Sequence, residues 1–383
     1  MNSPLEGSVE LNLKDGETVK SVSVTFIGEL LTSGNDRTTF LNISQEIFSA
    51  STTDISNVND NGPSKYIKLV GSHSFPYTLS VPSKVILKNK KGDTAEYDLP
   101  QTYFERLVRV TINYRIFATV KRGKFKADSQ VGTNVVYTPV IKPTIPSPLR
   151  QLAYAEEHPL IGPDGDPEGW HSLEPVTIRG TIFNSRNVEA ICTLSLAKPL
   201  SYTRGSFIPL HLSIQCSDMQ ALNLLSTPRS IDIKLRRILS MTADSHGLHP
   251  AFTVDSVDYQ NMASDIETAA WWPSAFGAED NGDLVNYNGT SRRMLDGEIR
   301  LPVGLYPSSQ LLSFAISYVV IFYPMTAVAF SPEKTQNKTI TSEAVNIVTA
   351  FLPGPRPKSY APPSYERTED RIGSEFSNME NMM

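Results

Sequence analysis

The chain has few cysteines and no recognisable catalytic motif. Only Cys192 and Cys216 occur among the 383 residues, and each lies in an alternating apolar run, so we expect buried, reduced thiols as in cytosolic proteins. The sequence contains no Gly-x-Ser-x-Gly elbow, no phosphate-binding loop, no dinucleotide-binding glycine triplet and no His-Glu-x-x-His pair. We therefore expect no enzyme. Paired carboxylates distant in the sequence leave a carbohydrate-active β-sandwich enzyme open as the least favoured alternative.

A large excess of charge of either sign is also absent. The net charge is -5 and 20% of the residues are charged, which gives no electrostatic footprint for nucleic acid, so we expect no nucleic-acid partner. Short basic stretches at 88–91, 121–126 and 292–293 could contact an anionic membrane face, but solvated strand ends and turns explain them more simply. The first residues lack the basic start and apolar stretch of a signal peptide, which predicts a cytoplasmic protein.

One uncharged stretch raises the question of a membrane helix. No charged residue occurs between Arg300 and Glu333, and residues 311–330 are mostly apolar. Prolines interrupt the stretch, however, and residues 314–322 alternate large apolar side chains with smaller or β-branched ones. This pattern predicts a strand buried on both faces rather than a membrane helix.

No segment shows a sustained helical period, and the dominant period is two. In residues 108–121, apolar side chains alternate with polar ones, as in a long strand with one face on a core. Similar runs recur along the chain and are separated by turn-forming clusters such as Lys14-Asp15-Gly16. Short helices are expected only at 149–157 and 218–225. The sequence therefore predicts an all-β protein of two tandem antiparallel β-sandwiches, immunoglobulin-like in architecture.

Proline marks the expected boundaries between these parts. Residues 1–143 form the first predicted sandwich, and the proline-rich residues 144–172 form the linker between domains. Residues 173–352 form the second sandwich. After residue 352 the chain becomes rich in proline, serine, asparagine and methionine and poor in strand formers, so 353–383 is predicted to be a disordered tail.

Two clusters resemble metal sites without completing them. Residues 164–169 (DGDPEG) copy the opening of a calcium loop, but the twelfth position is Pro175 where a bidentate glutamate should stand, so a solvated linker is favoured. His246 and His249, with Asp244, could hold zinc, but no cysteine is near and glycine separates them, so an exposed loop is favoured. We expect no metal and no cofactor.

The tail carries one motif whose context fits its mechanism, Pro362-Pro363-Ser364-Tyr365. Consecutive prolines pre-form a polyproline II segment, so docking into the aromatic groove of a WW domain costs little backbone entropy. Tyr365 can enter the neighbouring pocket. Pro362, Pro363 and Tyr365 are therefore the predicted WW-binding residues, while a plain proline-rich spacer is the alternative.

Several stretches resemble the arrestin family, in particular its α-arrestin branch. Residues 5–11 (LEGSVEL) and 22–29 (VSVTFIGE) are similar to the family's early "G-x-V-x-L" and "I-x-V-x-F-x-G" strands. Residues 71–82 (GSHSFPYTLSVP) resemble its "G-x-x-x-F-P-F-x-F-x-L-P" stretch, with Tyr77 in place of the second phenylalanine. Residues 194–212 resemble the opening of the arrestin C-terminal domain, and residues 316–320 fit a late core strand.

The resemblance implies arrestin N-terminal-like and C-terminal-like sandwiches without catalysis. It further implies a trafficking adaptor that binds membrane-protein cargo with its body and recruits a Nedd4-type ubiquitin ligase through the PPxY tail. Such a protein would promote cargo ubiquitination and endocytosis, and would be recruited peripherally to the plasma membrane or endosomes. A vesicle-sorting scaffold that works without a ligase is the runner-up.

The sequence departs from the family pattern at both ends. Members usually carry another strand before "G-x-V-x-L", and residues 1–4 are too few to supply it, so we expect the first sheet to lack that strand. Members of this branch often carry several proline-tyrosine motifs, and this tail has one, which predicts limited avidity.

Overall fold

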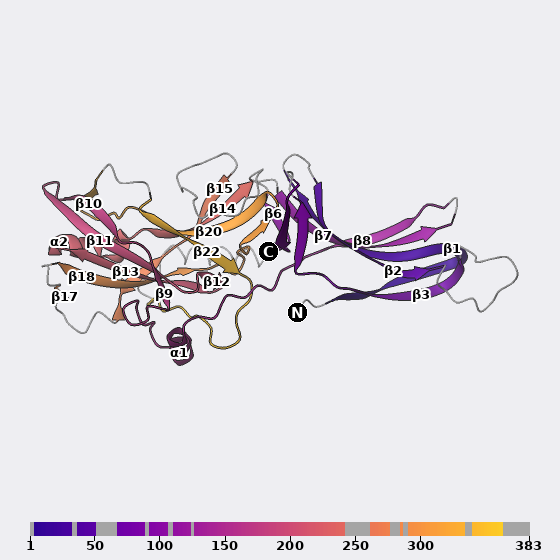
Figure 1. Cartoon of the computed structure of the whole chain (residues 1–383), viewed down its shortest axis with the longest axis horizontal. Helices are drawn as coiled ribbons and strands as arrows, with labels where there is room; N and C mark the ends of the chain where they lie inside the picture. Colours follow the sequence, from indigo (N-terminus) through magenta and orange to yellow (C-terminus); the bar gives the residue numbers. More distant parts are fainter. Residues whose placement is uncertain are drawn as a thin grey trace, which may run out of the picture. The chain divides into compact units, whose positions relative to one another are not determined.

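The chain folds into two compact units rich in antiparallel strands. The computed structural model describes residues 4–32, 37–50, 67–88, 92–105, 110–123, 126–241, 261–275, 284–285, 290–333 and 339–362. One unit comprises Met1–Pro139 and Gln310–Leu312, and the other comprises Val140–Ser309 and Ser313–Met383 (Figure 1). The predicted all-β fold with two β-sandwich domains is confirmed. Among the described residues, no helix has both the length and the apolarity needed to cross a membrane.

The first unit is built around one very long strand. Its strands are β1 (Leu5–Leu31), β2 (Arg37–Ser49), β3 (Ile67–Leu79), β4 (Lys84–Lys88), β5 (Thr94–Asp98), β6 (Tyr103–Glu105), β7 (Val110–Arg122) and β8 (Ser129–Val135). The sheet has the order β2-β1-β7-β6, β3 pairs with β1, β8 pairs with β7, and β4 and β5 form a hairpin. The first half of β1 pairs with β3, and its second half lies between β2 and β7. The sheet therefore curls as β1 changes partners.

The turn expected at residues 14–16 is absent, which corrects the sequence prediction. The backbone of β1 continues through these residues as a strand, and its register against β3 shifts between Leu13 and Glu17. A bulge accommodates the turn-forming residues there, because extra residues on one strand can be absorbed without ending the pairing.

The alternation predicted for residues 108–121 is confirmed in β7 where it is described. Val110, Ile112 and Tyr114 are buried, and the residues between them are only partly buried. The Tyr114 ring stacks on Phe26 with 5.7 Å between ring centroids, and its hydroxyl donates to the carbonyl of Pro100 at 2.7 Å. One face of β7 therefore packs on the core of this unit.

The second unit contains two sheets. Its elements are α1 (Pro148–Glu156), β9 (Trp170–Ser172), β10 (Val176–Ile182), β11 (Arg186–Ala197), β12 (Ser201–Thr203), β13 (Phe207–Cys216), α2 (Met219–Leu225), η1 (Pro228–Ser230), β14 (Ile233–Met241), β15 (Asn261–Thr268), β16 (Ala270–Pro273), β17 (Leu284–Val285), β18 (Ser291–Arg300), β20 (Phe314–Phe322), β21 (Phe330–Pro332) and β22 (Thr341–Val348). The short strand β19 (Ser309–Leu311) is divided between the units, with Gln310 and Leu311 assigned to the first. One sheet runs β16-β18-β13-β11-β10-β21, and the other runs β12-β22-β20-β14-β15. All of these pairs are antiparallel except β12 with β22.

Two central strands of this unit are buried on both faces. Every residue of β20 except Ser317 is buried, as predicted from the uncharged stretch. In β13, the alternating apolar residues Leu210, Leu212 and Ile214 are buried, but His211 and Ser213 on the opposite face are buried as well. The Trp170 ring of β9 lies 6.0 Å from the His211 ring, so it covers part of the face that alternation alone would leave to solvent.

Both short helices form close to their predicted positions. At α1 the Ser147 side chain accepts a hydrogen bond from the Arg150 amide, and Pro148 occupies the first turn, where its missing N–H costs nothing. At α2 the Asp218 side chain accepts from the amides of Gln220 and Ala221. The proline-rich residues 144–172 thus contain α1 and β9, and they belong to the second compact unit.

Candidate functional site

The stretch that leads to the PPxY motif packs on the second unit. We call residues 351–362 the C-terminal arm; in them the chain has left β22 and forms no strand. Just before the arm, the amides of Thr349 and Ala350 both donate to the carbonyl of Ile141, at 3.1 and 2.9 Å. Within the arm, the Arg356 guanidinium lies 4.8 Å from the centroid of the Phe351 ring. These contacts tie the start of the arm to the segment that precedes α1.

A buried carboxylate holds the far end of the arm. Glu298 of β18 is only 7% exposed, yet it accepts the hydroxyl hydrogen of Ser359 at Oε1 and the amide hydrogen of Tyr360 at Oε2, the latter over 3.0 Å. The ammonium of Lys358 also donates to Glu157, beyond the end of α1. Two hydrogen bonds from the arm converge on this one buried carboxyl group, so Glu298 fixes the arm at Ser359 and Tyr360.

Of the three predicted WW-binding residues, the structure places Pro362. It is half-buried and lies two residues beyond the anchored Tyr360. Pro363 and Tyr365 lie outside the described residues. The predicted tail, 353–383, therefore begins with a docked stretch, and residues 363–383 are not among those described.

No sequence pattern marks Glu298 as an anchor. Glu298 alternates with Gly297 and Ile299 in β18, as a solvent-facing residue of a half-buried strand would. It is buried because a segment about 60 residues later in the chain folds over it, an effect that local periodicity cannot encode.

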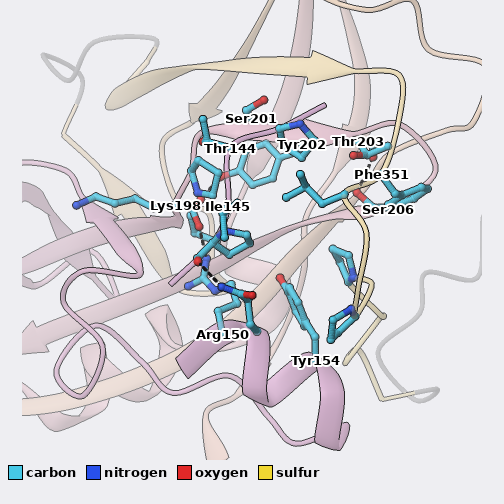
Figure 2. Close-up of a pocket in the computed structure, with 18 of the residues that line it drawn as sticks. Thr144, Ile145, Arg150, Tyr154, Lys198, Ser201, Tyr202, Thr203, Ser206 and Phe351 are labelled. Carbon is cyan, nitrogen blue, oxygen red and sulfur yellow. Dashed lines mark hydrogen bonds between the residues drawn. The ribbon is translucent and has the colours of Figure 1, made fainter. Parts of the chain in front are cut away.

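The arm also walls a cavity of about 320 Å³ within the second unit. α1 contributes Arg150 and Tyr154, β12 contributes Tyr202, and the arm contributes Phe351. Prolines 143, 146, 353, 355 and 357 form much of the remaining wall. Figure 2 shows Arg150 and Tyr154 rising from α1 toward the side that carries Tyr202, with Phe351 on the arm opposite.

Arg150 is the unusual residue of this cavity. Its side chain is only 3% exposed, its Nη1 donates to the carbonyl of Lys198 at 2.9 Å, and its guanidinium lies 4.7 Å from the centroid of the Trp170 ring (Figure 2 shows the Lys198 contact). Its Nε and Nη2 are buried without a hydrogen-bond partner among the described residues. Burial lowers the pKa of Arg150, because desolvation disfavours the cation, while nearby Tyr154, Tyr202 and Asp166 oppose the effect.

The tyrosines around Arg150 stay protonated at neutral pH. Burial raises the pKa of Tyr154 to about 12, with Arg150 opposing the shift. Burial also raises the pKa of Tyr202 and of Tyr360 in the arm. The Tyr360 hydroxyl oxygen is buried without a hydrogen-bond partner among the described residues. The cavity thus has neutral hydroxyl groups beside one buried cation.

The loop that resembles a calcium site is held together by protein contacts. The Asp166 carboxylate accepts from the Ser147 hydroxyl at 2.7 Å and the Gly169 amide at 3.0 Å, so it stabilises the start of α1. Asp164 forms an ion pair with Arg292 at 3.0 Å. Within the described ranges, no group of three His, Cys, Asp or Glu side chains is arranged to hold a metal ion. His246 and His249 lie outside the described residues.

The two cysteines are buried and form no disulfide with each other, as predicted. Cys192 of β11 is fully buried, and Cys216 of β13 is 2% exposed and donates to the carbonyl of Glu189 at 3.2 Å. Burial raises the pKa of the Cys192 thiol to about 12 and also raises that of Cys216. Thiolate chemistry is therefore disfavoured at both positions.

Comparison with known proteins gives no match: no protein-family model fits the chain, and a search of the curated proteins finds none similar to it. The arrestin resemblance therefore stands on the quoted motifs and the fold class alone.

Proposed function

We propose that this chain is a non-catalytic trafficking adaptor of the α-arrestin type. Its two β-sandwich units bind a membrane-protein cargo, and Pro362, Pro363 and Tyr365 recruit a Nedd4-type ubiquitin ligase through a WW domain. The ligase then ubiquitinates the cargo and promotes its endocytosis. In this proposal the protein works in the cytoplasm and reaches the plasma membrane or endosomes peripherally, with its basic stretches available to an anionic surface.

The position of Pro362, the first residue of the motif, is the observation that supports this proposal. The chain leaves the last strand of the second unit, passes along the arm, is held by Glu298 at Tyr360, and reaches the first motif residue two positions later. Pro362 lies outside any strand, and a proline there can adopt the polyproline II conformation that WW grooves bind, whereas a proline paired inside a sheet could not.

Titration of the full chain with a Nedd4-type WW domain tests the proposal directly. We expect an affinity on the order of micromolar, because a short single motif buries little surface. Calorimetry on a Tyr365→Ala variant should show no measurable binding, since the tyrosine pocket is then empty. Tyr360→Phe is the matched control in the same arm and should bind like the wild type.

Either of two results would reject ligase recruitment: no binding of the wild type, or equal binding of the wild type and Tyr365→Ala. Retained cargo trafficking after removal of residues 353–383 would instead favour the ligase-independent scaffold. Affinity capture with wild type and Tyr365→Ala separates the two halves of the proposal, because partners lost in the variant belong to the motif and partners retained belong to the body.

A further inference from the structure

We infer that the cavity between α1, β12 and the C-terminal arm is a binding site for a small apolar carboxylate, with Arg150 as the anchor of its carboxyl group. This inference concerns the second unit by itself and does not depend on ligase recruitment. Three observations carry it: the unused donors of Arg150, the charge balance around it, and the apolar walls of the cavity.

The unused donors of Arg150 form the edge that recognises carboxylates. Of the guanidinium nitrogens, Nη1 is already engaged with the Lys198 carbonyl, which leaves Nε and Nη2 without a partner. These two nitrogens lie on one side of the planar group, and their N–H bonds point in parallel, so they can donate to both oxygens of one carboxylate. Leaving such donors buried and unused is costly, and a bound carboxylate removes the cost.

The surrounding charges leave the Arg150 cation without a direct counter-ion. Asp166, a carboxylate that influences the pKa of Arg150, already accepts from Ser147 and Gly169 and forms no described hydrogen bond to Arg150. Lys198 also borders the cavity, but its side chain is exposed and points away from Arg150 and Tyr154 in Figure 2. One buried positive charge matches a ligand with one negative charge, which favours a carboxylate over a phosphate dianion.

The walls of the cavity select an apolar body. Proline rings, Ile145, Phe207, Phe351 and Leu352 face it, while Tyr154 supplies a protonated hydroxyl. The volume of about 320 Å³ is at the small end of the range for ligand pockets, which is roughly 300–1,000 Å³. A medium-chain or aromatic monocarboxylic acid has the size and polarity that these walls accept.

Calorimetric titration of the full chain with octanoate and with octan-1-ol tests the inference. The two probes share the same apolar chain and differ in the carboxylate. We expect octanoate to bind at least about tenfold more tightly than the alcohol, because hydrogen bonds to charged groups change binding constants by about ten- to hundredfold. Equal binding of the two probes, or binding of neither, would overturn the inference.

Variants identify the anchor. Arg150→Gln should weaken octanoate binding by about ten- to hundredfold, while Lys198→Gln removes a cation from the rim and should change it less than twofold. Arg150→Lys keeps the charge but loses the paired donors, so its affinity for octanoate should lie between those of Arg150→Gln and Lys198→Gln. Binding of octanoate by Arg150→Gln with wild-type affinity would contradict the assignment. If Arg150→Gln does not fold, the octanoate and octanol comparison on the wild type still decides the matter.

Discussion

In the second unit, Gly297 leaves room for the buried ring of Trp271. They lie opposite each other in the β16–β18 pair, and Trp271 is 1% exposed. A Cβ atom at position 297 would come within 2.6 Å of the Trp271 ring, so the indole occupies the space that any other side chain would need. A buried ring of this size can move only by displacing its own neighbours.

We therefore predict that Gly297→Ala lowers the free energy of unfolding by about 1–3 kcal/mol, the usual cost of overpacking a core. Gly304→Ala is the matched control, because a Cβ atom there meets nothing within 4 Å. Urea denaturation followed by tryptophan fluorescence would measure both. Equal stability of the two variants would show that the Trp271 ring does not limit this position.

The buried thiols support a prediction about pH. The pKa of Cys192 is raised by burial to about 12 from an ordinary value of 9.0, so the folded state keeps the proton that the unfolded state loses. This contribution to stability is complete below pH 9 and is lost as pH rises toward 12.

At pH 8 the native protein should not react with a disulfide reagent, and two thiols should react in denaturant. Ser185→Cys, in an exposed turn, is the positive control and should react at once. Fast native reaction of Cys192 would contradict the burial argument.

At the scale of elements, the C-terminal arm depends on one strand residue. Glu298 receives both the Ser359 hydroxyl and the Tyr360 amide, whereas Lys358 and Glu157 pair where both side chains are more than half exposed. Exposed ion pairs contribute little because water screens them, while hydrogen bonds to a buried carboxyl group contribute more. The anchoring of the arm should therefore depend on Glu298 and not on Glu157.

We predict that Glu298→Gln releases the end of the arm. The amide can accept through its oxygen, but its nitrogen is a donor and cannot accept from Ser359 or Tyr360. Hydrogen exchange should show faster exchange of the Tyr360 amide in Glu298→Gln and nearly unchanged exchange in Glu157→Gln. Unchanged exchange at Tyr360 in Glu298→Gln would mean that other contacts hold the arm.

Local pattern predicted the elements far better than it predicted the site. The period of two placed β7, the uncharged stretch predicted β20, and α2 forms within the expected residues 218–225. The bulge in β1 was missed because Lys14-Asp15-Gly16 has turn-forming residues whatever the strand does around them. Glu298 and Arg150 were missed because each is buried by chain that is distant in sequence, and burial of a charged residue leaves no mark on its neighbours in the sequence.

For the whole molecule, the number of docking motifs limits how tightly a multi-domain partner can be held. The sequence contains one proline-proline-x-tyrosine match, so under the proposed function one chain offers one WW-binding motif. Avidity requires two linked contacts made simultaneously, which a single motif cannot provide.

We predict that the affinity of a tandem array of WW domains for the full chain exceeds that of its best single domain by a factor no larger than about the number of domains. Such a factor is statistical and involves no avidity. Calorimetry with single domains and the intact array would measure this. A gain of a hundredfold or more would reveal a second contact, either in the body or in the tail.

The hold of Glu298 on Tyr360 has a geometric consequence for that partner. Tyr365 comes five positions after Tyr360, and five residue steps span at most about 18 Å even when fully extended. While the arm stays docked, any domain that binds Tyr365 must therefore remain close to the second unit. The surface around β18 would then be part of what the partner meets, and charge changes there should alter which ligases are accepted.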